Sequence, residues 1–152
     1  MKNHVKTTTN LSEQDEEICV DIFRNLMRAR HLMHQKASRV AAGAGLHAAE
    51  LNVIDILGKY GPISMGGLAR ECFISPSNTT STVKKLERSN LVKRKRSDDS
   101  DREVTVSLTN KGRTIFRKCY PRILAEAHEH MAERLTHGET TRLARILRKL
   151  AV

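Results

Sequence analysis

Apolar residues recur at helical spacing along most of this chain. Near its start, Ile18, Ile22 and Leu26 are four residues apart within a segment that runs from 12 to 42. This spacing places one apolar stripe along one face of a long helix. Gly-Ala-Gly at 43–45 provides a stop, because glycine adopts the backbone conformation that ends helices. The pattern predicts a first helix of about thirty residues, which is long for a compact domain.

Five further helices are predicted downstream. They cover residues 47–60, 65–72 after an N-cap at Ser64, 76–89, a long stretch that begins at the N-cap Thr109, and a last stretch that ends near Leu150. Thr136 and Glu139 form a capping box for the last helix. Pro121 lies inside the helix that Thr109 begins. We expect a kink or a break there, because proline removes a backbone hydrogen bond.

Period-two alternation marks two short strands near the middle of the chain. Residues 91–96 read LVKRKR and residues 103–108 read EVTVSL, with the polar turn SDDSDR between them. Ile63 is expected to add a one- or two-residue strand. The preceding helix has Ser75 as its N-cap and Pro76 at its first position, where the missing N–H is no loss. A capped helix followed by a basic hairpin is the layout of a winged helix.

The predicted fold class is therefore mainly α, an α+β winged helix with six helices and a two- to three-stranded wing. We divide the chain into a flexible N-terminal tail at 1–11, a helical dimerisation region at 12–45 and 109–152, and a winged helix-turn-helix DNA-binding domain at 46–108. A dimer is expected because the apolar stripes of the first and the last two helices are larger than the small winged domain can cover.

The distribution of charge along the chain also indicates that residues 75–113 bind a partner. The chain carries a net charge of +10, and residues 75–113 hold ten cations against five anions, whereas residues 1–74 hold nine against eight. This asymmetry favours a polyanionic partner that is engaged through one face. With no Trp, three Phe and two Tyr, the core must be largely aliphatic.

The segment resembles the multiple-antibiotic-resistance regulator (MarR) family of winged helix-turn-helix transcriptional regulators. The matching residues are Leu68-Ala69, Leu86-Glu87, Leu91-Val92-Lys93-Arg94, Asp101-Arg102, and Leu108-Thr109 with Gly112, in the family's order and spacing. Asn90 stands where the family usually has Gly, and Asn tolerates the left-handed conformation of a helix end. The resemblance covers roughly residues 12–150. It implies a homodimeric, sequence-specific regulator of double-stranded DNA, with two recognition helices about one DNA turn apart.

Candidate DNA contacts follow from the polar face of the helix at 76–89 and from the wing. Ser77, Asn78 and Ser81 are expected at base edges, where Asn pairs well with adenine. The remaining candidates are expected to contact phosphates, flanking bases or the minor groove. They are Ser64, Ser75, Thr80, Lys84, Lys85, Arg88, Lys93, Arg94, Lys95 and Arg96, with Asp101 and Arg102 at the wing tip. The resemblance implies that Arg102 enters the minor groove, where Asp101 holds its guanidinium.

A small-molecule effector is the next expectation, since members of the family often bind phenolic or carboxylate compounds. Candidate effector-binding residues are Arg24, Arg28, His31, His34 and His47. Arg28, His31 and His34 are spaced by three and could converge on one carboxylate. The function predicted is that of a repressor, which an aromatic or carboxylate ligand releases from its operator. The alternative is that these arginines form ordinary surface salt bridges and that the histidines are solvated.

A cysteine-based redox-sensing repressor is the alternative. Cys19 lies near the start of the first helix, roughly where the peroxide-sensing branch of the family keeps its reactive cysteine. That branch uses neighbouring tyrosines, whereas this helix has none and has Phe23 four residues on. We therefore interpret Cys19 as a buried apolar residue, and Cys72 and Cys119 as core residues.

Other classes find little support. An architectural DNA-binding protein would share the charge but not the ordered polar face from Ser77 to Ser81. There is no Gly-rich phosphate loop, nucleophile elbow or HExxH, so we expect neither an enzyme nor a cofactor. His128 and His130 point to different helix faces, and no metal site is expected. No apolar run approaches the ~18 residues of a membrane span. An odd cysteine count and no recognisable signal peptide suggest a cytoplasmic protein.

Overall fold

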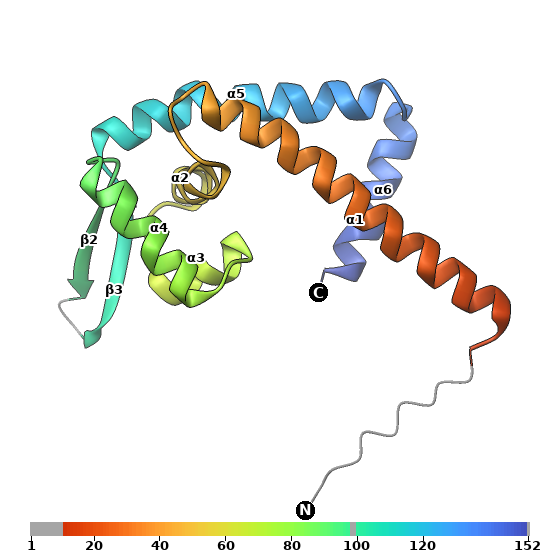
Figure 1. Cartoon of the computed structure of the whole chain (residues 1–152), viewed down its shortest axis with the longest axis horizontal. Coiled ribbons are helices and arrows are strands. Elements are labelled where there is room, and N and C mark those ends of the chain that lie inside the picture. Colours follow the sequence, from red (N-terminus) through yellow and green to blue (C-terminus); the bar gives the residue numbers. More distant parts are fainter. Residues whose placement is uncertain (1–10, 98–99, 152) are drawn as a thin grey trace, which may run out of the picture. The chain divides into compact units, whose positions relative to one another are not determined.

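The computed structural model describes residues 11–97 and 100–151, and the side chains of 97–103 lie outside that description. The described chain consists of α1 (Glu13–Ala42), α2 (Ala48–Tyr60), β1 (Ile63–Ser64), α3 (Met65–Cys72), α4 (Pro76–Arg88), β2 (Val92–Ser97), β3 (Ser100–Leu108), α5 (Asn110–Ala132) and α6 (His137–Leu150) (Figure 1). The predicted mainly helical winged fold is confirmed. The tail predicted at 1–11 falls, apart from Leu11, on residues outside the description.

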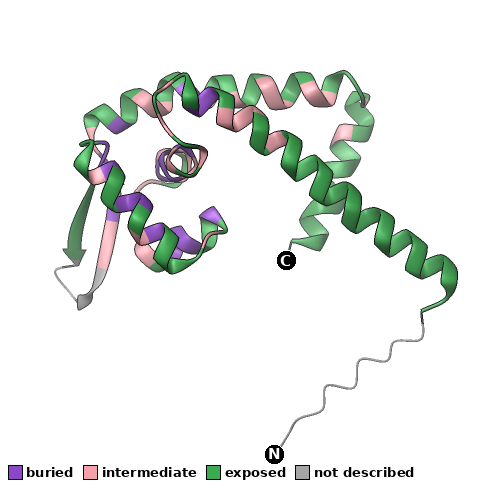
Figure 2. Cartoon of the chain, viewed as in Figure 1, coloured by how far each residue is buried: buried purple, intermediate pink, exposed green. Residues whose placement is uncertain are grey.

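The chain divides into two compact units, and the boundary between them lies within α1, between His34 and Gln35. In the first unit the described residues form the N-terminal part of α1, and every residue from 13 to 32 is exposed. The second unit holds the end of α1 and all the other elements. Figure 2 shows the buried positions gathered on α2, α3 and α4, whereas α6 is almost entirely exposed.

Side-chain caps start the helices where the sequence predicts them. Each cap oxygen accepts a hydrogen bond from the backbone N–H three residues on: Ser64 from Gly67 at 3.2 Å, Ser75 from Asn78 at 3.3 Å, Thr109 from Gly112 at 3.1 Å and Thr136 from Glu139 at 3.3 Å. The capping box of α6 is complete, because the Glu139 carboxylate accepts from the Thr136 N–H at 2.8 Å. That hydrogen bond stabilises the charged form, so the pKa of Glu139 is lowered.

The sheet is antiparallel with strand order β1-β3-β2. Ile63 pairs with Val106, which confirms the short third strand expected at Ile63. On the other side of β3, Val92 pairs with Leu108, and the pairing is irregular between Arg96 and Ser97. The basic strand β2 is thus an edge strand, and cations on an edge strand discourage pairing with a second chain.

The end of α4 is fastened to the base of the wing. Asn90 ends the helix with φ 56°, as predicted. The Thr109 hydroxyl donates to the carbonyl of Asn90 at 2.7 Å, and the Thr109 N–H donates to the carbonyl of Leu91 at 3.0 Å. Only glycine fits at position 112 without a shift of the backbone, because a Cβ at this position would lie 2.0 Å from the Leu91 carbonyl oxygen. Three residues of the quoted family motif, Leu91, Thr109 and Gly112, therefore meet at this joint.

Most of the core belongs to the winged helix. Ile54, Leu68, Val83 and Val106 have no exposed surface, and the inward stripe predicted on α4 is confirmed by the burial of Thr79, Val83 and Leu86. A smaller cluster joins Val40 and Ala41 of α1 to Leu51 and Cys119. Cys72 and Cys119 are buried, as predicted.

Pro121 was expected to kink or break the helix. α5 is not broken there, since it continues through this residue from Asn110 to Ala132. Proline removes a single backbone hydrogen bond. The bonds on either side remain, and the buried Cys119 anchors the helix close to the proline. Among the described residues, no helix is both long and apolar enough to span a membrane.

Candidate nucleic-acid interface

The N-terminal half of α4 presents a row of small polar side chains. Ser77, Asn78 and Ser81 are exposed, and Thr80 is half-buried. The Thr80 hydroxyl donates to the Pro76 carbonyl at 2.9 Å and the Ser81 hydroxyl donates to the Asn78 carbonyl at 2.9 Å. These two hydroxyls are used within the helix and keep acceptor capacity toward solvent.

Asn78 differs from its neighbours. Its backbone N–H is bound by the Ser75 cap at 3.3 Å, but its side-chain amide makes no hydrogen bond within the described part of the chain. A free amide presents a donor and an acceptor side by side, which is the pair that adenine offers in the major groove. Among the predicted base-edge residues, Asn78 is therefore the one best prepared for readout.

Cations follow on the same helix. Lys84, Lys85 and Arg88 are exposed, and within the described residues none of them has an ion-pair partner. Uncompensated cations of this kind neutralise phosphates and release counterions. The predicted grading along α4, from hydroxyl and amide groups to charges, is thus present on the surface of the helix.

The basic run of β2 is split between two faces. Successive side chains of a strand point to opposite sides, and residues paired across strands share a side. Arg94 is paired with the buried Val106, and Arg96 is paired with Val104, so both arginines lie on the side of the core and α4. Lys93 and Lys95 lie on the opposite side, paired with Ser107 and Thr105. Four consecutive cations therefore do not form one continuous contact surface.

Arg94 also joins the wing to the recognition helix. Its guanidinium donates to the carboxylate of Glu87 on α4, and both side chains are about one-third exposed. Planar guanidinium–carboxylate pairs are geometrically specific. This pair fixes β2 relative to α4, which is a structural role that the sequence interpretation of Arg94 as a backbone contact did not include.

The other predicted DNA residues fall into two groups. Ser64 and Ser75 are N-caps whose oxygens accept hydrogen bonds from Gly67 and Asn78. Asp101 and Arg102 belong to β3 by their backbone, and their side chains lie outside the described part of the structure.

The predicted effector residues fall in both units. Arg24, Arg28, His31 and His34 are exposed along α1 in the first unit, and Arg28 donates to Asn25 at 3.5 Å. His47 belongs to the second unit as the N-cap of α2, where its N–H donates to the Glu50 carboxylate at 2.8 Å. Within the described residues, no group of three or more His, Cys, Asp or Glu side chains is placed to hold a metal ion.

Cys19 is exposed, so the prediction that it is buried is wrong for the single chain. The described part of its unit is one helix, which has no second element to cover a side chain. Burial raises the pKa of the Cys72 thiol to about 11 and also raises the pKa of Cys119. The exposed cysteine is therefore the one that a solvent oxidant can reach.

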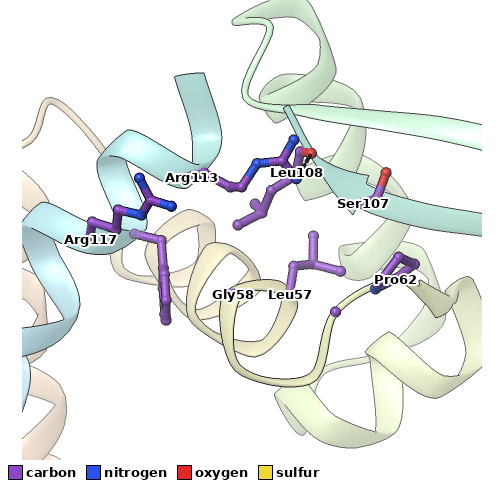
Figure 3. A pocket seen from close by; sticks show the side chains of 9 residues that line it. Leu57, Gly58, Pro62, Ser107, Leu108, Arg113 and Arg117 are labelled. Atoms are coloured by element: carbon purple, nitrogen blue, oxygen red, sulfur yellow. Dashed lines mark hydrogen bonds between the residues drawn. The ribbon is translucent and has the colours of Figure 1, made fainter. Parts of the chain in front are cut away.

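A pocket that the sequence interpretation missed lies between α2, the end of β3 and the start of α5 (Figure 3). It has a volume of about 250 Å³ and is lined by Leu57, Gly58, Gly61, Pro62, Ser107, Leu108, Arg113, Phe116 and Arg117. Arg113 and Arg117 are four residues apart on one helix, so they share a face. That spacing was visible in the sequence, but the apolar wall opposite it was not.

Together, a capped recognition helix, a basic antiparallel hairpin and a helix-turn-helix at α3 and α4 define a winged helix DNA-binding protein. The model of the MarR family matches residues 46–104. The HTH-type transcriptional regulator PchR of Bacillus subtilis is 30% identical over an alignment of 118 positions that covers 70% of this chain and 68% of PchR. The chain belongs to the MarR family of transcriptional regulators. Its relatives are DNA-binding regulators rather than enzymes.

Solved structures agree with this fold. The transcriptional regulator PA4135 superposes with a TM-score of 0.77 at 25% identity, over 85% of this chain and 94% of PA4135. Sco3205, a MarR family transcriptional regulator from Streptomyces coelicolor solved in complex with DNA, gives a TM-score of 0.77 at 22% identity, over 93% of this chain and 91% of its own.

Proposed function

We propose that this chain is a homodimeric repressor that reads a roughly palindromic operator through α4 and the wing, and that a small carboxylate-bearing ligand releases it. The observation that carries the first part is the Asn78 amide on the exposed N-terminal face of α4, followed by the cations Lys84, Lys85 and Arg88, none of which has a partner among the described residues. The amide supplies base discrimination and the cations supply phosphate affinity.

The dimer is supported by apolar surface that the chain leaves uncovered. Phe23 is 64% exposed and Ile22 is 50% exposed on α1, and Leu150 is 63% exposed on α6. No residue of α6 is buried, although Leu143, Ile146, Leu147 and Leu150 form one stripe. Contiguous exposed apolar faces mark interaction surfaces, and a second copy presents an identical face.

Release by a ligand is supported by two structural neighbours. NadR was solved in complex with 4-hydroxyphenylacetate and gives a TM-score of 0.75 at 22% identity. BpsR of Bordetella bronchiseptica, with a TM-score of 0.77 at 20% identity, is described by the regulation of its DNA binding by 6-hydroxynicotinic acid. A ligand of this class acts on the present chain if it binds one spacing of the two recognition helices more tightly than another.

The base-readout proposal is tested by fluorescence anisotropy on DNA from upstream of the protein's own gene, with scrambled DNA as the competitor. Asn78→Ala should lose about 1–3 kcal/mol on the operator and little on scrambled DNA. Lys84→Ala should weaken both DNAs alike and reduce the slope of log affinity against log salt by about 1. Equal affinity of the wild-type protein for operator and scrambled DNA would instead indicate an architectural protein.

The redox alternative rests on the exposure of Cys19, and experiments can distinguish it from release by a ligand. Under that alternative, peroxide abolishes operator binding, a thiol restores it, and Cys19→Ala makes binding indifferent to peroxide. A reporter gene placed behind the operator distinguishes repression from activation.

A further inference from the structure

We propose that Phe73 is a specificity-determining residue of the DNA-binding surface, and that its ring contacts the methyl group of a thymine in the major groove. Phe73 belongs to the turn that joins α3 to α4 and lies two residues before Ser75, the N-cap of α4. The inference rests on the proposed function, because it requires α4 to read the operator. It adds an apolar contact to the polar readout that we expect from Ser77, Asn78 and Ser81.

The backbone at Phe73 is strained. This residue is left-handed, with φ 54° and ψ 41°. The Phe73 N–H donates to the Arg70 carbonyl at 3.1 Å, and the Ile74 N–H donates to the Ala69 carbonyl at 3.2 Å, which is the hydrogen-bond pattern of a Schellman motif. Glycine is the usual residue at the left-handed position of this motif, because it has no Cβ to be crowded there. Phenylalanine at this position therefore adds strain that glycine would avoid.

The Phe73 ring does not contribute to the core in return. It is 92% exposed, the highest value among the large apolar side chains that the structure describes. The apolar contact of the turn is made instead by Ile74, which is half-buried and packs against the core of the winged helix. Strained residues cluster at binding sites, and this one also exposes an aromatic ring. Both observations indicate that Phe73 serves contact with a partner.

The position of Phe73 identifies DNA as that partner. Two residues of chain span at most about 7 Å, so the Cα of Phe73 lies within that distance of the Cα of Ser75. The Ser75 hydroxyl lies 3.0 Å from that of Ser77, so Phe73 borders the polar N-terminal end of α4. In helix-turn-helix proteins this end of the recognition helix contacts base edges. The Asn52 amide donates to the Cys72 carbonyl at 3.2 Å, which fixes the backbone just before the ring.

The chemistry of the ring selects the methyl group of thymine. A phenyl ring has no hydrogen-bonding group for a phosphate oxygen or for the polar edge of a base. The C5-methyl group of thymine is the apolar group that the major groove presents, and phenylalanine is one of the side chains that contact it. We therefore expect Phe73 to distinguish thymine from uracil at one position of each half-site.

The experiment uses the full-length protein and DNA from upstream of its own gene, with binding followed by fluorescence anisotropy. Uracil replaces thymine at one symmetry-related pair of positions at a time, which removes only the methyl groups. One pair should weaken binding of the wild-type protein about fourfold for each half-site, the value expected for the burial of one methyl group. Phe73→Gly should bind the unmodified operator as weakly as the wild-type protein binds this uracil operator, and uracil should cause it no further loss.

Two further variants separate contact from folding. Phe73→Leu keeps an apolar side chain and should restore part of the preference for thymine. Asn90→Gly is the matched control, because Asn90 is the other non-glycine residue with positive φ in the described chain and lies after α4. It should keep the affinity and the thymine preference of the wild-type protein within twofold. A variant that was merely destabilised would still distinguish thymine from uracil, so the lost preference is specific to contact.

Three results would overturn the inference while the proposed function stands. They are a wild-type protein that prefers the operator but is indifferent to uracil at every pair, an equal effect of uracil on wild-type protein and Phe73→Gly, and equal weakening of Phe73→Gly on operator and scrambled DNA. The last result would place the ring on the sugar-phosphate backbone. Equal affinity of the wild-type protein for operator and scrambled DNA would refute the proposed function, and this inference with it.

Discussion

Apolar residues recur at helical spacing both in the winged helix and in the terminal helices α1 and α6, but the two regions differ in burial. In the winged helix, Leu68 and Val83 have no exposed surface and Leu86 is 1% exposed. In the terminal helices, residues with the same spacing stay open, such as Ile22 at 50% and Leu150 at 63%. The winged helix finds partners for its apolar faces within about sixty residues of the same chain.

The difference separates two kinds of stability. Burying a large aliphatic or aromatic side chain is worth roughly 1.5–3 kcal/mol, so a helix with several such residues exposed forgoes much of its stabilisation. The winged helix should therefore unfold at a concentration-independent midpoint. The terminal helices should gain their stability from association, and their unfolding should depend on protein concentration.

The largest expected effect is a break in the joint that closes the winged helix. Gly112→Ala places a Cβ 2.0 Å from the Leu91 carbonyl oxygen, and a backbone atom cannot move aside cheaply. We expect a loss of about 3 kcal/mol or more in the free energy of unfolding, by urea denaturation followed by circular dichroism.

The control is Gly66→Ala on α3. Its Cβ would meet nothing closer than the Arg70 guanidinium at 4.0 Å, and alanine favours the helix. This variant should gain up to about 1 kcal/mol. Equal effects of the two substitutions would contradict the assignment of Gly112 to a close backbone approach.

Much of this contrast could be predicted from the sequence. Caps at Ser64, Ser75 and Thr109 and the inward stripe of α4 depend on neighbouring residues, and all of them were found where they were predicted. Uncovered stripes on the terminal helices were expected from their size alone. Local chemistry determines such features, and the sequence displays it directly.

The features that the sequence did not predict correctly depend on tertiary contacts. Cys19 was expected to be buried but is exposed in the single chain, because spacing shows a stripe but not what covers it. Pro121 was expected to kink or break α5, and the break does not occur, because proline removes only one backbone hydrogen bond and the packing at Cys119 holds the helix nearby. The pocket at Arg113 and Arg117 needed the end of β3 and the apolar side of α2 beside these arginines, and residues that far apart in the chain give no joint signal.

The second prediction uses pH to probe the closed core. Burial raises the pKa of the Cys72 thiol to about 11, whereas an unperturbed thiol ionises at 9.0. Between these values the unfolded chain holds fewer protons than the folded one, so stability falls as pH rises from 9 toward 11. Relative to Cys72→Ala, the wild-type protein should lose about 2 kcal/mol between pH 8.5 and 10.5 in urea titrations.

Measuring the wild-type protein and Cys72→Ala side by side separates the contribution of this thiol from that of every other titrating group, because only the thiol is removed. An identical pH dependence for Cys72→Ala and the wild-type protein would show that the buried thiol does not contribute to the loss.

The third prediction concerns association and uses two exposed phenylalanines. Phe23 is 64% exposed on α1, and Phe73 is 92% exposed in the turn between α3 and α4. If the terminal helices form the dimer, Phe23→Asp should raise the dissociation constant at least tenfold, about 1.4 kcal/mol, in analytical ultracentrifugation. Phe73→Asp introduces the same charge and should leave the dimer intact. An unchanged constant for Phe23→Asp would remove this part of α1 from the interface.

The smallest expected effect lies within the winged helix, at the two non-glycine residues with positive φ in the described chain, Phe73 at 54° and Asn90 at 56°. The left-handed conformation costs an ordinary L-residue about 1–2 kcal/mol, and asparagine less. Because the Phe73 side chain is 92% exposed, Phe73→Asn loses no burial and should stabilise the protein by up to about 1 kcal/mol. Asn90→Ala should destabilise it by a similar amount.

Both changes are measured as shifts in the urea midpoint at constant slope. Neither should depend on protein concentration, because both residues lie in turns within the winged helix, one between α3 and α4 and the other after α4. A concentration-dependent shift would place the turn at Phe73 in the association surface. Destabilisation by Phe73→Asn would mean that the ring contributes to the fold despite its exposure, and the strain argument would then hold for Asn90 alone.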